Sequence, residues 1–171
     1  LIADAPGHHL VPHAQVEPVD EHALHVDEGG DRLDAHRVHR RRGVVRRGRN
    51  VVVVEFENPF DKDGSGLHKA TDPADGLEYV FSDCEPFNAN RFFPCFDQPD
   101  LKATYAVSVT APQDWVVVAN GGETALEEVD AGHRRHRFAR TERFSTYVVA
   151  VCAGPYQVFT DASARVPSRI L

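Results

Sequence analysis

The 171-residue sequence contains no Met, one Trp and only three Cys. It also has no apolar run long enough to span a membrane and no charged-then-apolar leader, which predicts neither a membrane span nor a signal peptide. A sparse, odd set of Cys favours reduced thiols over a disulfide framework. We therefore expect a cytoplasmic protein without a membrane partner, and the lack of Met together with the abrupt end at Leu171 indicates a piece of a longer chain.

Residues 3–49 lack most of the residue types that build a core. They hold seven of the ten His and eight Arg, but no aromatic residue, Ile, Lys, Asn, Ser, Thr, Cys or Met. Such a composition is difficult to fold because aromatic and β-branched side chains other than Val are missing. Residues 1–49 are therefore interpreted as an atypical His/Arg-rich segment, either poorly ordered or translated out of frame from GC-rich coding sequence.

The charge balance argues against nucleic acid as a partner. Asp and Glu number 26 against 19 Lys and Arg, and the acidic excess falls in the well-patterned part of the chain after residue 50. The Arg-rich run HRVHRRRGVVRRGR (36–49) could grip phosphate, but it has no aromatic side chains on which bases could stack. A basic nucleic-acid-binding tail is therefore the last-ranked interpretation.

From Asn50 onward, short β-type runs alternate with turn clusters, and no long helical period competes with them. The clearest run is 102–110, in which Ala103, Tyr105, Val107 and Val109 alternate with more polar or smaller residues, as in a half-buried strand. This pattern predicts an all-β domain over residues 50–171, an antiparallel sandwich or barrel. Strands are expected at 51–57, 77–81, 102–110, 114–120, 133–140, 144–154 and 155–160, and turns at 61–66, 72–76 and 97–100.

Two patterns resemble metal sites. Glu21, His22 and His25 resemble the His-Glu-x-x-His of zinc peptidases, but the Glu precedes the first His and the two His are only three residues apart. DKDGSGLHKATD (61–72) spaces its oxygen-bearing side chains like a calcium loop, yet strands rather than helices flank it. A chance His pair and a solvated, Gly-rich connection are the favoured interpretations, so no metal ligand is predicted in this chain.

The stretch SDCEPFNANRFFPCFDQPDLKATY (82–105) concentrates the remaining chemistry. Cys84 and Cys95 stand among Phe residues, where a Cys is usually a small buried hydrophobe, and no sequence signal joins His68 to either thiol as a base. Asp83 and Glu85 are two residues apart at the end of a β-type run, so their side chains should point to the same face. Two like charges side by side require a cation or water around them.

The same stretch resembles the N-terminal domain of the M1 (aminopeptidase N) zinc metallopeptidases. Residues 91–103, RFFPCFDQPDLKA, are similar to that family's R-x-x-F-P-C-F-D-x-P-x-x-K-A signature, with one residue fewer after the Arg, and FSTYVVA (144–150) is similar to its M-S-T-Y-L-V-A-F. Gly66-Leu67-His68 and Asp72-Pro73 add matches upstream. The resemblance extends over about residues 46–160, and residues 1–45 show no such match.

The resemblance implies an antiparallel β-sandwich that serves a cytosolic enzyme removing N-terminal residues from peptides. One zinc ion is expected in a thermolysin-like catalytic domain that this chain does not contain, so the fragment should be inactive alone and should work with that domain in cis. Carried over by motif, Glu85 is the carboxylate that holds the substrate's free α-amino group, and Asp83 stands where many members have Gln. The loop that carries Glu85 would be supported from behind by the packed side chains of Phe92, Phe93, Phe96 and Cys95. The alternative is a non-catalytic β-sandwich that binds peptides or a partner.

Overall fold

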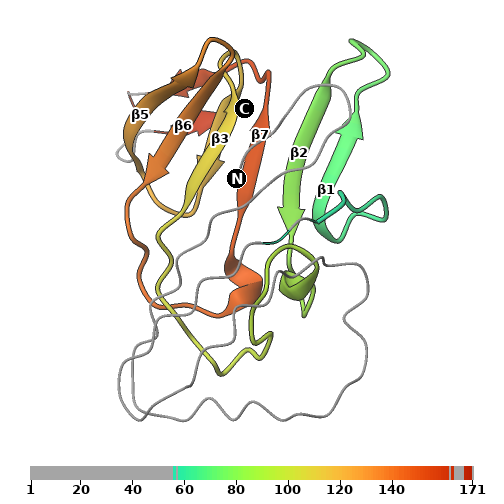
Figure 1. Ribbon diagram of the computed structural model, residues 1–171, viewed down its shortest axis with the longest axis vertical. Helices are drawn as coiled ribbons and strands as arrows, with labels where there is room; N and C mark the ends of the chain where they lie inside the picture. The colour runs from blue at the N-terminus through green and yellow to red at the C-terminus, as the bar shows by residue number, and fades with distance from the viewer. Residues whose placement is uncertain (1–55, 57, 162, 164–167, 171) are drawn as a thin grey trace.

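The computed structural model describes residues 56, 58–161, 163 and 168–170 (Figure 1). The atypical segment 1–49, with its His pair and its Arg run, lies outside these residues, as does nearly all of the strand predicted at 51–57. Within the described part of the chain, no helix is long and apolar enough to cross a membrane.

The larger sheet is antiparallel and has the strand order β1-β2-β7-β4. The β1–β2 hairpin is closed by the predicted turn at 72–76, where the Gly76 amide donates to the Asp72 carbonyl oxygen (2.8 Å) and Gly76 has a φ of 72° that only Gly adopts readily. The turn prediction is therefore confirmed. The strands are β1 (Gly66–Thr71), β2 (Glu78–Asp83), β4 (Val116–Ala119) and β7 (Val151–Gly154).

The second sheet has the order β3-β6-β5 and consists of β3 (Ser108–Pro112), β5 (Glu123–Asp130) and β6 (His133–Phe138). Strand β6 carries three Arg or His side chains that pair with acids of β5, which explains how so polar a segment forms a strand. Arg137 forms two hydrogen bonds with Glu127 (2.7 and 3.1 Å), and His136 Nδ1 lies 2.7 Å from Glu123. Strand β5 was not predicted, because this acidic segment has no apolar run.

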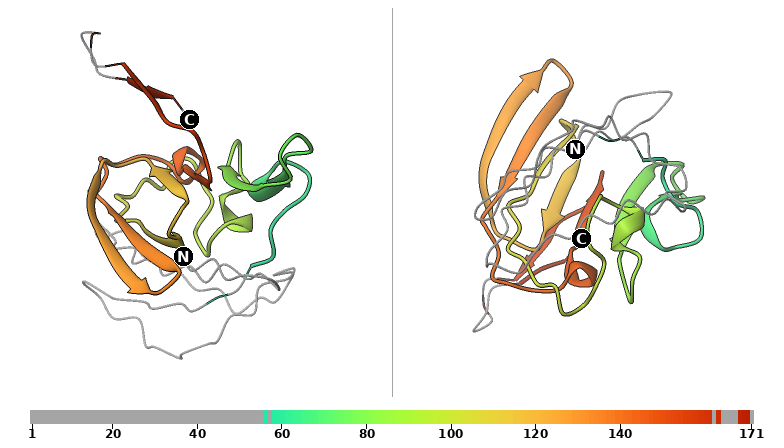
Figure 2. Two further views of the ribbon diagram at one scale, coloured as in Figure 1. Left: turned by 90° about the horizontal axis from the view of Figure 1, so that it is seen from above. Right: turned by 60° about the horizontal axis from the view of Figure 1, so that its bottom comes forward.

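A single core lies between the two sheets. Its members come from both sheets, and the most completely buried large side chain is Val109 of β3. Figure 2 shows the two sheets on opposite sides of this interior. The all-β antiparallel sandwich predicted from the sequence is thus confirmed, and the described residues contain no α-helix. Strand residues in the core are Leu67, Val80, Val109, Ala111, Val117, Phe138, Val151 and Ala153.

Three predicted strands, 102–110, 144–154 and 155–160, are regular over less than half of their expected length. In 102–110, Tyr105 and Val109 are buried as predicted, but Thr110 is buried as well, and regular pairing begins only at Ser108. Before Ser108, the chain pairs with 138–144 through an isolated bridge, backbone hydrogen bonds and the Thr141 hydroxyl. In 144–154 a 3-10 helix, η2 (Thr146–Val148), precedes β7. Beyond β7, the strand predicted at 155–160 is regular only in β8 (Phe159–Asp161), which pairs with β9 (Ser168–Ile170) in a hairpin that projects from the sandwich (Figure 2).

Candidate functional site

The carboxylates singled out in the sequence stand at the end of β2. Asp83 is the last residue of the strand and Glu85 follows two positions later, and both side chains are exposed. Between them Cys84 is only 2% exposed, so its side chain enters the core while its two neighbours face outward. The chain therefore presents two exposed carboxylates, two residues apart, at the end of β2.

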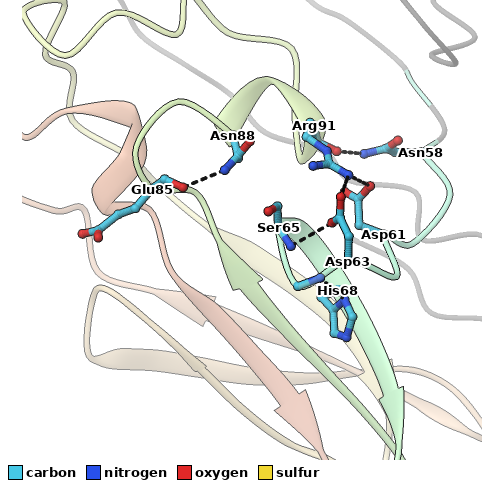
Figure 3. Close-up of polar contacts among 9 residues, drawn as sticks. Asn58, Asp61, Asp63, Ser65, His68, Glu85, Asn88 and Arg91 are labelled. Atoms are coloured by element: carbon cyan, nitrogen blue, oxygen red, sulfur yellow. Dashed lines mark hydrogen bonds and ion pairs between the residues drawn. The ribbon is translucent and has the colours of Figure 1, made fainter.

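Residues 84–91, here called the anchoring loop because Ala89 anchors them in the core, are held in shape by their own polar groups. The Asn88 amide donates to the Cys84 carbonyl oxygen (2.9 Å), and the Asn88 side-chain amide donates to the Glu85 carbonyl oxygen (2.6 Å). Asp83 Oδ1 accepts a hydrogen bond from the Glu85 amide (3.2 Å), and the Glu85–Pro86 peptide bond is cis. The backbone of Glu85 is thus fixed on both sides, while Figure 3 shows its carboxylate pointing away from Asn88.

The loop ends in the 3-10 helix η1 (Ala89–Arg91), which the core anchors through Ala89, a residue with no exposed surface. The last residue, Arg91, turns its guanidinium toward the segment before β1 (Figure 3). There Arg91 Nη2 donates to Asp61 Oδ1 (2.6 Å) and to Asp63 Oδ2 (2.9 Å), an arrangement that we call the Arg91 clamp. The hydrogen bonds that Arg91 donates to these two carboxylates, the one to Asp63 first, raise the pKa of Arg91 above its ordinary value.

The clamp explains the calcium-like spacing of residues 61–72. Two of the carboxylates in that pattern, those of Asp61 and Asp63, bind Arg91, and the third, Asp72, accepts a hydrogen bond from the Ala74 amide (2.8 Å) in the β1–β2 turn. The pKa of Asp63 is lowered by the Ser65 amide and then by Arg91. The interpretation of the whole segment as a solvated connection was wrong for its second half, because residues from Gly66 onward form β1.

Asp97 has a role that the sequence did not reveal. Its Oδ2 accepts hydrogen bonds from the amide and the side chain of Asn90 (both 3.1 Å), while its Oδ1 accepts one from the buried Thr146 hydroxyl (2.6 Å). The expected turn lies one residue later, where the Leu101 amide donates to the Gln98 carbonyl oxygen (3.0 Å). Asp97 therefore ties η1 to η2, two segments that pairing between strands does not join.

The three thiols are free in the structure and are placed as small hydrophobes rather than as nucleophiles. Burial, reinforced by Asp97, raises the pKa of Cys84 and of Cys95 to about 12, and burial also raises that of Cys152. Since the thiolate is the reactive form of Cys, these groups are unreactive at neutral pH. The structural role predicted for Cys84 and Cys95 agrees with this environment.

The Phe residues of the 82–105 stretch divide into two pairs. Phe92 and Phe93 are 3% and 6% exposed and belong to the core, as predicted. Phe96 was predicted to pack with them, and this was wrong, because it is 58% exposed. Phe87, within the anchoring loop, is 65% exposed as well. Two aromatic side chains therefore stand on the surface of the segment that carries Glu85.

Comparison with known proteins agrees with this architecture. The family model that matches the chain is the Peptidase M1 N-terminal domain, over residues 15–148. Because the match spans most of the chain, this chain belongs to the M1 peptidase family. The match also includes residues 15–45, for which the sequence motifs had indicated no resemblance.

Curated relatives are aminopeptidases. The chain is 37% identical over 109 residues to Aminopeptidase N of Streptomyces lividans, covering 64% of this chain and 12% of that protein. It is 34% identical over 120 residues to Probable M1 family aminopeptidase 1 of Encephalitozoon cuniculi, covering 70% and 14%, and 32% identical over 100 residues to Glutamyl aminopeptidase of Mus musculus, covering 57% and 11%. The chain thus spans about an eighth of the length of these relatives.

M1 peptidases are zinc-dependent, and the described residues do not fit a zinc site. Over residues 58–161, 163 and 168–170, no group of three or more His, Cys, Asp or Glu side chains could hold a metal ion. The carboxylates of the Arg91 clamp are committed to a guanidinium instead.

Proposed function

We propose that this domain anchors the free N-terminus of a peptide substrate in a zinc-dependent aminopeptidase. Glu85 and Asp83 would hold the α-ammonium group of the substrate. The observation that carries the proposal is the pair of outward-facing carboxylates at the end of β2, in a chain that belongs to the M1 family.

The chemistry of the pair suits this role. A substrate's terminal ammonium is a cation with three donors, whereas an internal peptide bond carries no charge, so two adjacent carboxylates select chain ends. In the domain alone both side chains are exposed, where water weakens such a pair. We therefore propose that a catalytic domain in cis covers the site, excludes water from it and contributes the zinc ion.

Glu85→Gln in the full-length protein that carries this domain tests the proposal. The substitution keeps the size of the side chain and removes its charge, so kcat/KM for an aminoacyl arylamide should fall. Removing one member of a desolvated charge pair costs about 2–5 kcal/mol, which corresponds to a loss of roughly 30-fold to 5,000-fold.

Glu128→Gln is the matched control, because it makes the same chemical change at an exposed position of β5, in the other sheet. Its kcat/KM should equal that of the unmodified enzyme. If Glu85→Gln also leaves kcat/KM unchanged, Glu85 does not hold the substrate. Absent or chelator-insensitive aminopeptidase activity in the unmodified full-length protein would contradict the proposed enzyme class.

A further inference from the structure

We infer that Arg91 is a positioning residue, which holds the anchoring loop so that Glu85 meets the substrate, through its clamp on Asp61 and Asp63. The inference rests on the proposed function, because it concerns how the anchoring carboxylate is placed. It gives a role in substrate binding to Arg91, Asp61 and Asp63, which lie outside the rim of β2 and would not contact the substrate themselves.

The Arg91 clamp is a strong interaction. One nitrogen of Arg91 donates to two carboxylates at once, and charge-assisted hydrogen bonds of this kind are among the strongest in proteins. Asp61 is the less exposed partner, with 19% of its side chain accessible against 61% for Asp63, so water competes less for its bond. Asn58 adds a hydrogen bond from its side-chain amide to the Arg91 carbonyl oxygen. Arg91 is thus held by both its side chain and its backbone.

Two hydrogen bonds connect Arg91 to Glu85. The Arg91 amide donates to the Asn88 carbonyl oxygen (3.0 Å), and the Asn88 side chain donates to the Glu85 carbonyl oxygen (2.6 Å). Figure 3 shows the two ends of this series, the contacts of Arg91 with Asp61 and Asp63 and the contact of Asn88 with Glu85. Because these two hydrogen bonds join Arg91 to Glu85 through Asn88 alone, a displacement of Arg91 would be transmitted to the backbone of Glu85.

The Arg91 clamp is closely packed against the start of β1. Gly66, with a φ of +69°, passes beside it, and a Cβ at this position would lie 2.3 Å from Asp61 Oδ2 and 2.8 Å from Arg91 Cβ. The start of β1 therefore leaves Asp61 and Arg91 little space in which to move. The clamp joins the rim of β1 to the loop that leaves β2, and so fixes the loop relative to the sheet that carries it.

Enzyme kinetics on the full-length protein test this inference. Arg91→Gln should lower kcat/KM about tenfold to a hundredfold, since misplacing a substrate-holding group by about 1 Å has effects of that order. Arg91→Lys keeps a single nitrogen that can serve both carboxylates, so it should retain more activity than Arg91→Gln. Arg137→Gln is the matched control, because Arg137 also pairs with a carboxylate, Glu127, but on the β5–β6 hairpin. It should leave kcat/KM unchanged.

A second measurement separates positioning from general damage to the fold. The affinity of a substrate-like inhibitor with a free α-amino group should fall in Arg91→Gln, while its counterpart without the amino group should bind as before. If Arg91→Gln does not fold, Asp63→Asn tests the same clamp at an exposed side chain and should give a smaller loss for the amino-bearing inhibitor only.

Double variants distinguish failure of the inference from failure of the proposed function. In a Glu85→Gln background, Arg91→Gln should have little further effect, because the carboxylate that it positions is already neutral. If instead Arg91→Gln lowers kcat/KM by the same factor with and without Glu85, Arg91 does not act through Glu85 and the inference is wrong, while the proposed function stands. If Glu85→Gln alone changes nothing, the proposed function itself fails.

Discussion

Phe93→Ala should strongly destabilise the domain. The Phe93 ring is 6% exposed, and it meets Phe92 and Tyr105 edge-on at centroid distances of 5.4 and 6.4 Å. Truncating a buried Phe to Ala costs about 3–5 kcal/mol, because apolar contacts are lost and a cavity remains. Phe96 is 58% exposed, and replacing such a surface residue changes stability by no more than about 0.5 kcal/mol.

Urea unfolding of the chain measures this difference. The single Trp, Trp115, packs against the core, so its fluorescence reports unfolding of the sandwich. With a denaturant slope of about 2 kcal/mol/M, Phe93→Ala should lower the midpoint by about 1.5–2.5 M, and Phe96→Ala by less than about 0.3 M. Phe93→Leu, with a smaller loss of volume, should fall between them and serves if Phe93→Ala does not fold. Equal shifts for Phe93→Ala and Phe96→Ala would refute the division into buried and exposed pairs.

Other predictions concern Asp97, the thiols and Gly66. Asp97→Asn should cost about 1.5–3 kcal/mol in urea unfolding, because its hydrogen bonds lose a charged acceptor; an unchanged midpoint would show that the link between η1 and η2 adds nothing. Burial raises the pKa of Cys84 and Cys95 from 9.0 to about 12 in the folded domain, so between these pH values the thiols lose their protons more readily in the unfolded chain. The urea midpoint should therefore fall as pH rises from 9.0 toward about 12, and a midpoint that rises with pH would contradict this prediction. Gly66→Ala should lower the unfolding midpoint more than Gly64→Ala, because both positions have positive φ but only Gly66 lacks space for a Cβ, and equal losses would contradict the close packing.

Much of the fold was predictable because alternation along a strand is a local property. The burial of Tyr105 and Val109 and the turn at 72–76 follow from neighbouring residues alone. Strands β1 and β5 were not predicted, because their sequences lack an apolar run and they are formed by pairing with β2 and β6. The predicted start of β7 was wrong because the buried Ser145 and Thr146 hydroxyls bond to other segments, which favours a 3-10 turn there.

The candidate site was also predictable only in part. The positions of Asp83 and Glu85 at the end of a strand could be predicted, since both follow from a short stretch and from the resemblance to the M1 family. The clamp could not, because Arg91 lies 30 residues from Asp61 along the chain, and no local pattern reports a contact over that separation. For the same reason the hydrogen bond between Asp97 and Thr146, 49 residues apart, was not predicted, and Asp97 was interpreted only as part of a turn.

The pairing of β2 with β7 has a consequence for how this domain is made. The Val151 amide donates to the Ser82 hydroxyl, 69 residues earlier in the chain, so the larger sheet cannot close until β7 has been synthesised. At about 5–20 residues per second, the β1–β2 hairpin waits on the order of several seconds on the ribosome. An isolated hairpin is marginally stable and has an open edge. The loop that carries Glu85 leaves β2 directly, so until β7 is made it follows a strand that is paired on one side only.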